Sequence, residues 1–223
     1  MKTKTKGLLI VGLLVLLTCV QTSIVAAELN APQRVLQETS DLLYGIVQQN
    51  KERLKDRQFV AQLVNEVIEP RVDLDKISRL ILGKYWRKAT DEQKVNFQKQ
   101  FKNLLVNTYA VAFKEFDDWT VRFLPMSLKP EDKRVIVKSQ IIITSRPPIA
   151  VNYRMAKNKE GDWKAYDVII EGISMVTNYK SSFAKSIKRS GGLDNVIKEL
   201  ADKNERSKKA ANELALDESN SNT

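Results

Sequence analysis

The chain has 223 residues, a formal net charge of +10 at pH 7, 43% hydrophobic residues, one cysteine and no histidine. Without histidine it cannot build a Ser/His/Asp or Cys/His catalytic centre, or a metal site with a histidine ligand. The sequence also has no HExxH motif, no glycine-rich phosphate loop and no calcium-binding loop. These features favour a binding protein that needs no metal and no cofactor over an enzyme.

The first 27 residues have the order of a secretory signal peptide. Three lysines precede an apolar run over residues 7–20, and small residues follow it at positions 26 and 27. The run is shorter than the roughly 20 apolar residues that span a bilayer. We therefore expect export to the periplasm, with cleavage after Ala27.

The single cysteine offers an alternative interpretation of this leader. Cys19 would be the attachment site of a lipoprotein, although Thr18 is a poor residue just before a lipidated cysteine. Cleavage after Ala27 would remove Cys19 and leave a mature chain without a disulfide or a thiol nucleophile. Such an exported chain must fold on its hydrophobic core alone.

Helical periodicity begins just after the leader. Apolar residues recur at helical spacing over residues 35–47 and again over residues 59–68. Pro70 ends the second stripe, because proline lacks a backbone N–H and clashes with the preceding turn. The sequence therefore predicts two helices before residue 70.

Capping residues mark the next two helices. Asp73 is placed to cap a short helix over residues 74–81, which Gly83 would stop. Thr90 and Gln93 form a capping box at the start of a long helix. We expect that helix to end at the acidic pair of residues 117–118.

The periodicity then changes from helix to strand. Strands are predicted over residues 119–124, 134–144, 149–156 and 163–170, where β-branched and aromatic residues are concentrated. Residues 157–162 form a polar turn with a glycine. The short connections between successive strands imply an antiparallel sheet.

Helical periodicity returns after Gly172. A stripe over residues 175–187 is ended by Gly191, and a short helix is predicted over residues 193–200. The charged segment over residues 203–223 is expected to be disordered. Helices, then strands, then helices define an α+β fold, which we assign to a single domain over residues 28–202.

The packing of the predicted sheet has two interpretations. Residues 141–143 are all isoleucine, so both faces of that strand are apolar. In a sheet with one face exposed to water, apolar and polar residues would alternate more regularly along each strand. Either helices cover both faces in an ordinary packed core, or one face borders an apolar cavity, and periodicity alone does not separate the two.

Two stretches resemble the MlaC family of periplasmic phospholipid-binding proteins, also called the toluene-tolerance family. The first is the run from Leu82 to Thr90, continued by Gln93, Phe97, Phe101, Leu104, Leu105 and Tyr109. The second joins a strand end, a turn glycine and a helix start in a fixed order. It runs from Asp167 to Ser174, continues from Asn178 to Phe183 and ends with Gly191, Gly192 and Leu193.

The resemblance implies a twisted four-stranded antiparallel sheet wrapped by helices, in a nuclear-transport-factor-like cone that holds acyl chains. It also implies a monomeric carrier that moves phospholipid between the outer-membrane lipoprotein complex and the inner-membrane ABC transporter complex of the Mla pathway. That pathway keeps the outer membrane asymmetric. One departure is Lys180, where family members often have arginine; the charge is kept but the bidentate geometry is not.

An acyl-chain cavity would draw on apolar residues of the strands and of the facing helices. Ordinary core packing is the alternative role for each of them. The candidate residues are Ile77, Ile81, Phe101, Leu105, Tyr109, Phe123, Val137, Ile141, Ile143, Tyr153, Val168, Ile170, Val176 and Phe183.

The basic residues Arg154, Lys164 and Lys180 are candidates for contact with phosphate headgroups or with acidic partner surfaces. The alternative is that they are solvated surface charges. Nucleic acid is not an expected partner, because export separates the chain from it and the basic residues form no stripe with stacking aromatics.

Two rival functions remain. A periplasmic chaperone or adaptor would bind apolar protein segments instead of lipid. An enzyme on the same fold would use acidic pairs such as Asp117 with Asp118 or Glu131 with Asp132, although adjacent acids at element ends are usually caps or turn residues.

Overall fold

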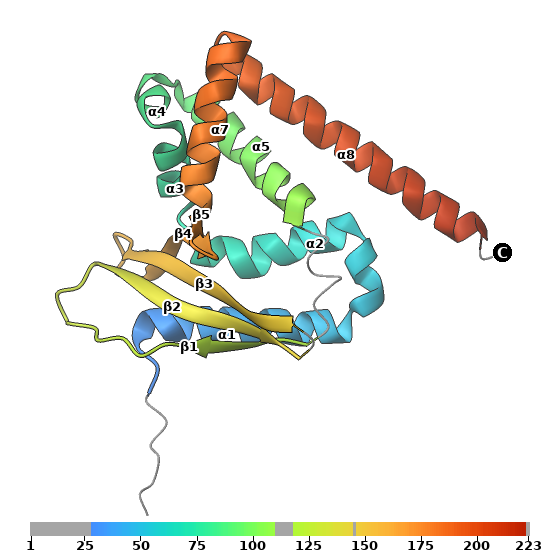
Figure 1. Ribbon diagram of the computed structural model, residues 1–223. Helices are drawn as coiled ribbons and strands as arrows, with labels where there is room; N and C mark the ends of the chain where they lie inside the picture. Colours follow the sequence, from blue (N-terminus) through green and yellow to red (C-terminus); the bar gives the residue numbers. More distant parts are fainter. Residues whose placement is uncertain (1–27, 110–117, 145, 222–223) are drawn as a thin grey trace, which may run out of the picture.

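The computed structural model describes residues 28–109, 118–144 and 146–221 (Figure 1). The expected signal peptide and the segment over residues 110–117, where the long helix was expected to end, lie outside the described residues. Within the described ranges the chain forms an α+β fold in which helices cover an antiparallel sheet, as the sequence predicted.

The sheet has five antiparallel strands in sequence order. They are β1 (Thr120–Phe123), β2 (Arg134–Ile143), β3 (Arg146–Lys157), β4 (Trp163–Ile170) and β5 (Ile173–Ser174). The four predicted strands are confirmed with small shifts of their ends. The predicted strand count is wrong by one, because the chain turns back after β4 and adds the two-residue β5.

The turn between β4 and β5 has a specific backbone cause. Ile170 pairs with Ile173, so Glu171 and Gly172 form a two-residue hairpin loop. Both have positive φ angles, +46° and +82°. Positive φ at both central residues is typical of the type I′ turn that matches the twist of paired strands. The turn brings Ser174 to the start of the following helix.

The helices before residue 72 are more broken than predicted. α1 spans Ala31–Gln49, a 3-10 turn η1 spans Lys51–Lys55, and α2 spans Arg57–Leu63. The chain then widens into a π-helix, η2 (Val64–Ile68), and ends in a 3-10 turn, η3 (Glu69–Arg71). The predicted stop at Pro70 therefore falls within η3.

The predicted capping residues of the next helices are confirmed. Asp73 accepts a hydrogen bond from the backbone N–H of Lys76 at 2.9 Å and caps α3 (Leu74–Leu82). The short α4 (Lys84–Lys88) was not predicted. Thr90 and Gln93 make both hydrogen bonds of the capping box at the start of α5 (Asp91–Tyr109), at 2.9 and 3.1 Å.

The C-terminal part contains α7 (Met175–Ser190) and α8 (Leu193–Ser221). Gly191 ends α7 with a left-handed φ of +80°, as expected from the glycine pair. The expected disorder from residue 203 is not found, because α8 continues to Ser221. The segment contains no glycine or proline and has several Ala, Lys and Glu residues, which favour helix even without an apolar face.

The side chains form three buried clusters. α1 packs on the sheet next to Val137, Met155, Trp163 and Ala165. A second cluster joins α1 to η1, α2 and η2. The third joins α3, α4, α5, α7 and the first half of α8 around Phe97 and Phe101. Figure 1 shows these last helices standing together at one end of the sheet, with α8 projecting beyond it. In the described parts of the chain, no helix has the length and apolarity needed to cross a membrane.

Candidate functional site

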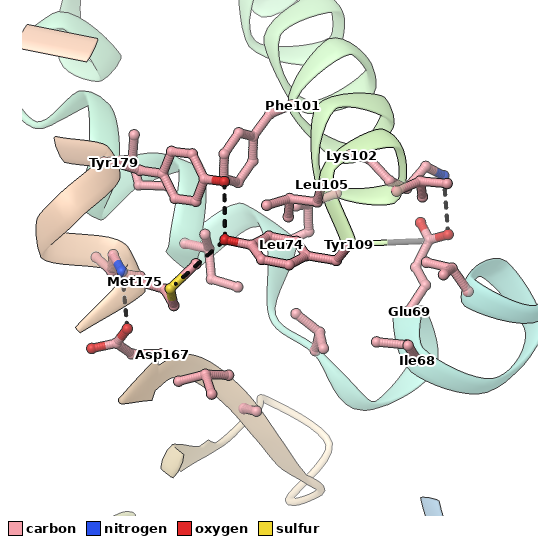
Figure 2. A pocket seen from close by; sticks show the side chains of 18 of the residues that line it. Ile68, Glu69, Leu74, Phe101, Lys102, Leu105, Tyr109, Asp167, Met175 and Tyr179 are labelled. Atoms are coloured by element: carbon pink, nitrogen blue, oxygen red, sulfur yellow. Dashed lines mark hydrogen bonds and ion pairs between the residues drawn. The ribbon is translucent and has the colours of Figure 1, made fainter. Parts of the chain in front are cut away.

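An apolar cavity of about 340 Å³ lies between β4 and the helices α2, α3, α5 and α7. Seventeen of its twenty lining residues are uncharged, and most of these are aliphatic. Figure 2 shows side chains from α5, α7, β4 and the η2–η3 segment pointing into this space. The lining residues are Val60, Val64, Ile68, Glu69, Val72, Leu74, Ile77, Ile81, Phe101, Lys102, Leu105, Val106, Tyr109, Ala165, Asp167, Val168, Ile170, Met175, Val176 and Tyr179.

The π-helix η2 supplies one wall. Val60, Val64 and Ile68 follow one another at intervals of four along α2 and η2, so they line the same side. A π-turn is wider than an α-turn and often occurs at functional sites. The wider turn carries Ile68 and the following Glu69 to the edge of the cavity.

A buried carboxylate joins the sheet wall to the helix wall. Asp167 on β4 accepts hydrogen bonds from Arg154 Nη1 at 3.1 Å, from Ser174 Oγ at 2.7 Å and from the backbone N–H of Val176 at 3.0 Å. Its side chain is 1% exposed. Ser174 also caps α7 by accepting from the N–H of Thr177 at 3.1 Å. Because Asp167 accepts from both Ser174 and the N–H of Val176, the first turn of α7 is fixed against β4.

Aromatic side chains close the side of the cavity between α5 and α7. The hydroxyl oxygens of Tyr109 and Tyr179 lie 3.5 Å apart, and Tyr109 Oη is 3.9 Å from Met175 Sδ. The Tyr179 ring meets Phe101 edge-on, with centroids 5.1 Å apart (Figure 2). Burial raises the pKa of Tyr179, and the hydrogen bond with Tyr109 raises it further. The phenol therefore stays neutral and suits an apolar neighbour.

One ion pair lies on the cavity wall. Lys102 Nζ on α5 is 3.1 Å from Glu69 Oε2 on η3. The two side chains are 29% and 40% exposed, so both reach solvent. Figure 2 shows them pointing toward each other across the gap between α5 and the η2–η3 segment. The wall is therefore apolar inside and charged at this accessible edge.

The structure brings eight of the fourteen candidate cavity residues to this wall. They come from α3, α5, β4 and α7. The eight are Ile77, Ile81, Phe101, Leu105, Tyr109, Val168, Ile170 and Val176.

The other six candidates do not line the cavity. Phe123, Val137 and Tyr153 pack in the cluster beneath α1, and Phe183 is buried among the aromatic rings of α5 and α7. Ile141 and Ile143 lie on β2, where the pairing with β3 slips by a residue between them. None of the six borders this cavity, because it lies against β4, whereas Val137 and Tyr153 of β2 and β3 pack beneath α1 and Phe183 of α7 packs among aromatic rings.

The three basic candidates also lie off the cavity wall. Arg154 is bound to Asp167. Lys180 lies on the exposed side of α7, where it approaches Gly83. Lys164 is half-buried on β4, paired with Ala156 of β3. Three charged residues do line the cavity, namely Asp167, Glu69 and Lys102. Sequence reasoning missed the pair of Glu69 and Lys102, because nothing in their spacing connects η3 with α5.

Of the acidic pairs considered as catalytic candidates, only the second shows a turn hydrogen bond among the described residues. Asp117 lies outside the described residues, and Asp118 accepts from Tyr44 Oη at 3.4 Å. Asp132 accepts from the backbone N–H of Lys129 at 2.9 Å, while its neighbour Glu131 is exposed. Among the described residues no group of three His, Cys, Asp or Glu side chains is placed to hold a metal ion.

The η2–η3 wall and its residues were the main omission of the sequence analysis. The stripe over residues 59–68 was identified, but nothing in it distinguished a cavity wall from a core helix. The combination of the stripe with Pro70 was the available signal, since it places an irregular helix end beside apolar residues. The complete wall offers close contact to a hydrocarbon chain, and its volume lies in the range of about 300–1,000 Å³ typical of ligand sites.

Three comparisons relate this chain to known proteins. A family model described as MlaC protein matches residues 37–202. The toluene tolerance protein ttg2D of Pseudomonas putida is 34% identical over 204 residues, which cover 90% of this chain and 93% of the relative. The intermembrane phospholipid transport system binding protein MlaC of Haemophilus influenzae is 24% identical over 173 residues, covering 76% of this chain and 80% of the relative.

A solved structure shares the fold. It is a phospholipid-binding protein from Ralstonia solanacearum in complex with a phospholipid. The two chains superpose with a TM-score of 0.74 at 30% sequence identity, over 80% of this chain and 99% of the other.

Proposed function

This chain belongs to the MlaC family, and on that premise we propose that it is a periplasmic phospholipid carrier. In this proposal it moves lipid between the outer-membrane lipoprotein complex and the inner-membrane ABC transporter complex of the Mla pathway. The main observation in support of this proposal is the apolar cavity between β4 and the helices. The family match, the names of the relatives and the phospholipid complex of the Ralstonia protein support the choice of cargo.

The energetics explain why a carrier needs such a cavity. Moving acyl chains into water costs about 0.8 kcal/mol per CH₂, or on the order of 20 kcal/mol for a two-chain lipid. Apolar side chains such as Leu105, Val168 and Val176 replace the bilayer as the surroundings of the tails. No bond is made or broken, so direction comes from differences in affinity between partners and from the transporter.

The same cavity should lower the stability of the protein when no ligand fills it. At about 24 cal/mol per Å³, an empty apolar space of this size costs about 8 kcal/mol. Ordinary domains are stable by about 5–15 kcal/mol. We therefore expect the isolated protein to hold lipid, and the stripped protein to melt at a lower temperature or to become less compact.

The periplasmic location rests on the leader. The first 27 residues have the order of a secretory signal peptide. Determining the N-terminal residue of the mature protein by mass spectrometry tests the cleavage after Ala27. A mature chain that begins at a lipidated Cys19 would instead anchor the protein in a membrane.

Mass spectrometry of organic extracts from the purified protein tests the cargo. A carrier yields phospholipid in about stoichiometric amount, and a chaperone for apolar protein segments yields none. To exclude lipid that adheres to any basic surface, an exported protein of similar charge purified in parallel is the control. Absence of phospholipid from protein isolated without detergent would reject the proposed cargo.

A further inference from the structure

The charged residues of the cavity wall differ in their access to solvent. Asp167 is 1% exposed and is held by Arg154, Ser174 and the first turn of α7. Lys102 and Glu69 are 29% and 40% exposed and are paired with each other at 3.1 Å. A ligand in the cavity can therefore reach one positive and one negative group at its edge without breaking the bonds of Asp167.

We propose that Lys102 and Glu69 form the headgroup subsite of this cavity and favour zwitterionic headgroups, with a phosphate and an ammonium, over anionic ones. This inference rests on the proposed function of the cavity as a phospholipid site. The phosphate would take Lys102 and the ammonium would take Glu69, so the ion pair is exchanged for two new ion pairs. Charge-assisted contacts of this kind are stronger than neutral hydrogen bonds.

Glu69 is the residue that would distinguish zwitterionic from anionic headgroups. An anionic headgroup brings a phosphate to Lys102 but offers no positive charge to the carboxylate, which then loses its partner and repels the phosphate. A site can gain specificity from such an unfavourable contact with the wrong ligand as well as from favourable contacts with the right one. Lys102 alone would select for phosphate without distinguishing the two lipid classes.

The position of Lys102 on α5 connects this subsite with the tails. Its neighbours Phe101, Leu105 and Val106 all line the cavity, whereas the ammonium group of Lys102 reaches the accessible edge (Figure 2). Lysine commonly lays its aliphatic stem along apolar surface and keeps its charge toward water. A lipid whose tails contact α5 thus has its phosphate within reach of Lys102.

The expected discrimination is modest. Partly exposed ion pairs contribute little, and converting the usual range of their strength gives an effect of about two- to fivefold. We therefore expect the wild-type protein to take up zwitterionic lipid in excess over anionic lipid by a factor in this range. Removal of Glu69 should abolish that excess.

The test is a competition between two lipids. The full mature protein is stripped of lipid and incubated with vesicles of equimolar phosphatidylethanolamine and phosphatidylglycerol with matched acyl chains. Bound lipid is extracted and quantified by mass spectrometry. Glu69→Gln should raise the ratio of bound phosphatidylglycerol to bound phosphatidylethanolamine about two- to fivefold, whereas Lys102→Gln should lower the uptake of both lipids.

Two matched variants control for charge and for position. Glu66→Gln removes an exposed acid from the same segment, one that bonds Gln62 and does not line the cavity. Lys94→Gln removes a lysine of α5 that is 30% exposed and pairs with Asp91 at 2.9 Å, again away from the cavity. Both should keep the wild-type lipid ratio and uptake, and melting curves verify that every variant is folded.

The outcomes separate this inference from the proposed function. If wild-type protein takes up lipid but Glu69→Gln leaves the ratio unchanged, or Glu66→Gln shifts it equally, the subsite is wrong and the carrier function stands. If Lys102→Gln takes up both lipids as well as wild-type protein, the phosphate contact is wrong. If wild-type protein takes up neither lipid, the proposed function fails and the subsite with it.

Discussion

Two interiors meet at β4, and they use the same kinds of side chains in different ways. Beneath α1, Val137 and Met155 are fully buried in a packed interior with Trp163 and Ala165. Next to it, the cavity wall of α2, η2, α3, α5 and α7 carries equally apolar residues around an open space, and Ala165 borders both interiors. Apolar character therefore determines burial, but the spacing of the backbone elements determines whether the buried space is filled.

The backbone features of the cavity wall explain the difference. The π-turn of η2 widens the helix at Val64–Ile68, and the bonds of Asp167 hold the start of α7 on β4. The packed interior has no comparable spacer within the residues that the structure describes, and α1 lies directly on the strands (Figure 1). Changes to the cavity wall and to the packed interior should therefore differ in their effects on stability and on lipid uptake.

Loss of Asp167 should weaken the cavity wall most. Asp167→Ala leaves Arg154 and the N–H of Val176 without their acceptor, and breaking a buried ion pair costs about 3–5 kcal/mol. Because Arg154 is 41% exposed and can be hydrated, we expect a cost near the lower limit. Urea denaturation measures the free energy of unfolding.

The destabilisation caused by Asp167→Ala should be confined to the cavity wall and should spare the packed interior beneath α1. Hydrogen exchange of α7 amides should accelerate in Asp167→Ala, while α1 keeps its protection. The control is Asp132→Ala at an exposed turn, which should cost about 0.5 kcal/mol or less. Equal acceleration in α1 and α7 would mean that Asp167 supports the whole fold and not specifically the cavity.

Truncating an apolar side chain should cost more in the packed interior than on the cavity wall. Met155 is 0% exposed, so Met155→Ala leaves a new void and should cost about 2–5 kcal/mol. Leu105 already borders empty space, so Leu105→Ala in lipid-free protein should cost less than Met155→Ala, about 1–2 kcal/mol. Equal costs, measured by urea denaturation of stripped protein, would contradict an open space beside Leu105.

Enlarging a side chain should also cost more stability in the packed interior than on the cavity wall, where it should instead reduce lipid uptake. Val137→Trp has no room and should destabilise by about 1–3 kcal/mol or more, because overpacking forces strained rotamers. Leu105→Trp can extend into the cavity with a smaller cost but should reduce phospholipid uptake severalfold. Thermal melting and lipid extraction of both variants provide the comparison. Normal uptake by folded Leu105→Trp would place the lipid elsewhere.

Most of the fold followed from local signals in the sequence. The capping box at Thr90, the cap at Asp73 and the turn over residues 157–162 act within a few residues, so they were visible without tertiary information. α8 shows the limit of this reasoning. Its second half is charged, which suggested disorder, but helix propensity continues where no glycine or proline interrupts it.

The cavity was harder to predict because it depends on which face of each strand is turned inward. The pairing of β2 with β3 slips between Ile141 and Ile143, and that of β3 with β4 slips between Arg154 and Met155. Each slip changes the face on which later residues fall, so simple alternation misassigns them. Helical candidates such as Ile77 and Val176 were less affected, since a stripe over several turns tolerates such errors.

Two tyrosines make the contrast testable by pH. Burial raises the pKa of Tyr153, beneath α1, to about 12. Burial and the Tyr109 hydroxyl raise the pKa of Tyr179 on the cavity wall. Unfolded tyrosine titrates near pH 10, so the neutral phenols add stability that is fully present below about pH 10 and is lost as pH rises toward the folded values.

The expected pH effect is the smallest, because it is absent at neutral pH. Above about pH 10, the free energy of unfolding should fall less steeply in Tyr153→Phe and in Tyr179→Phe than in wild-type protein, and lysine titration cancels in the comparison. Bound lipid should affect the pKa values of the two tyrosines differently. Tails beside Tyr179 desolvate it further and should raise its pKa, whereas Tyr153 packs in the cluster beneath α1, away from the cavity, and should not respond. Tyrosinate absorbance of each variant, with and without phospholipid, measures this shift. A response at Tyr153 alone would place the cargo beneath α1, in the interior that the structure shows filled.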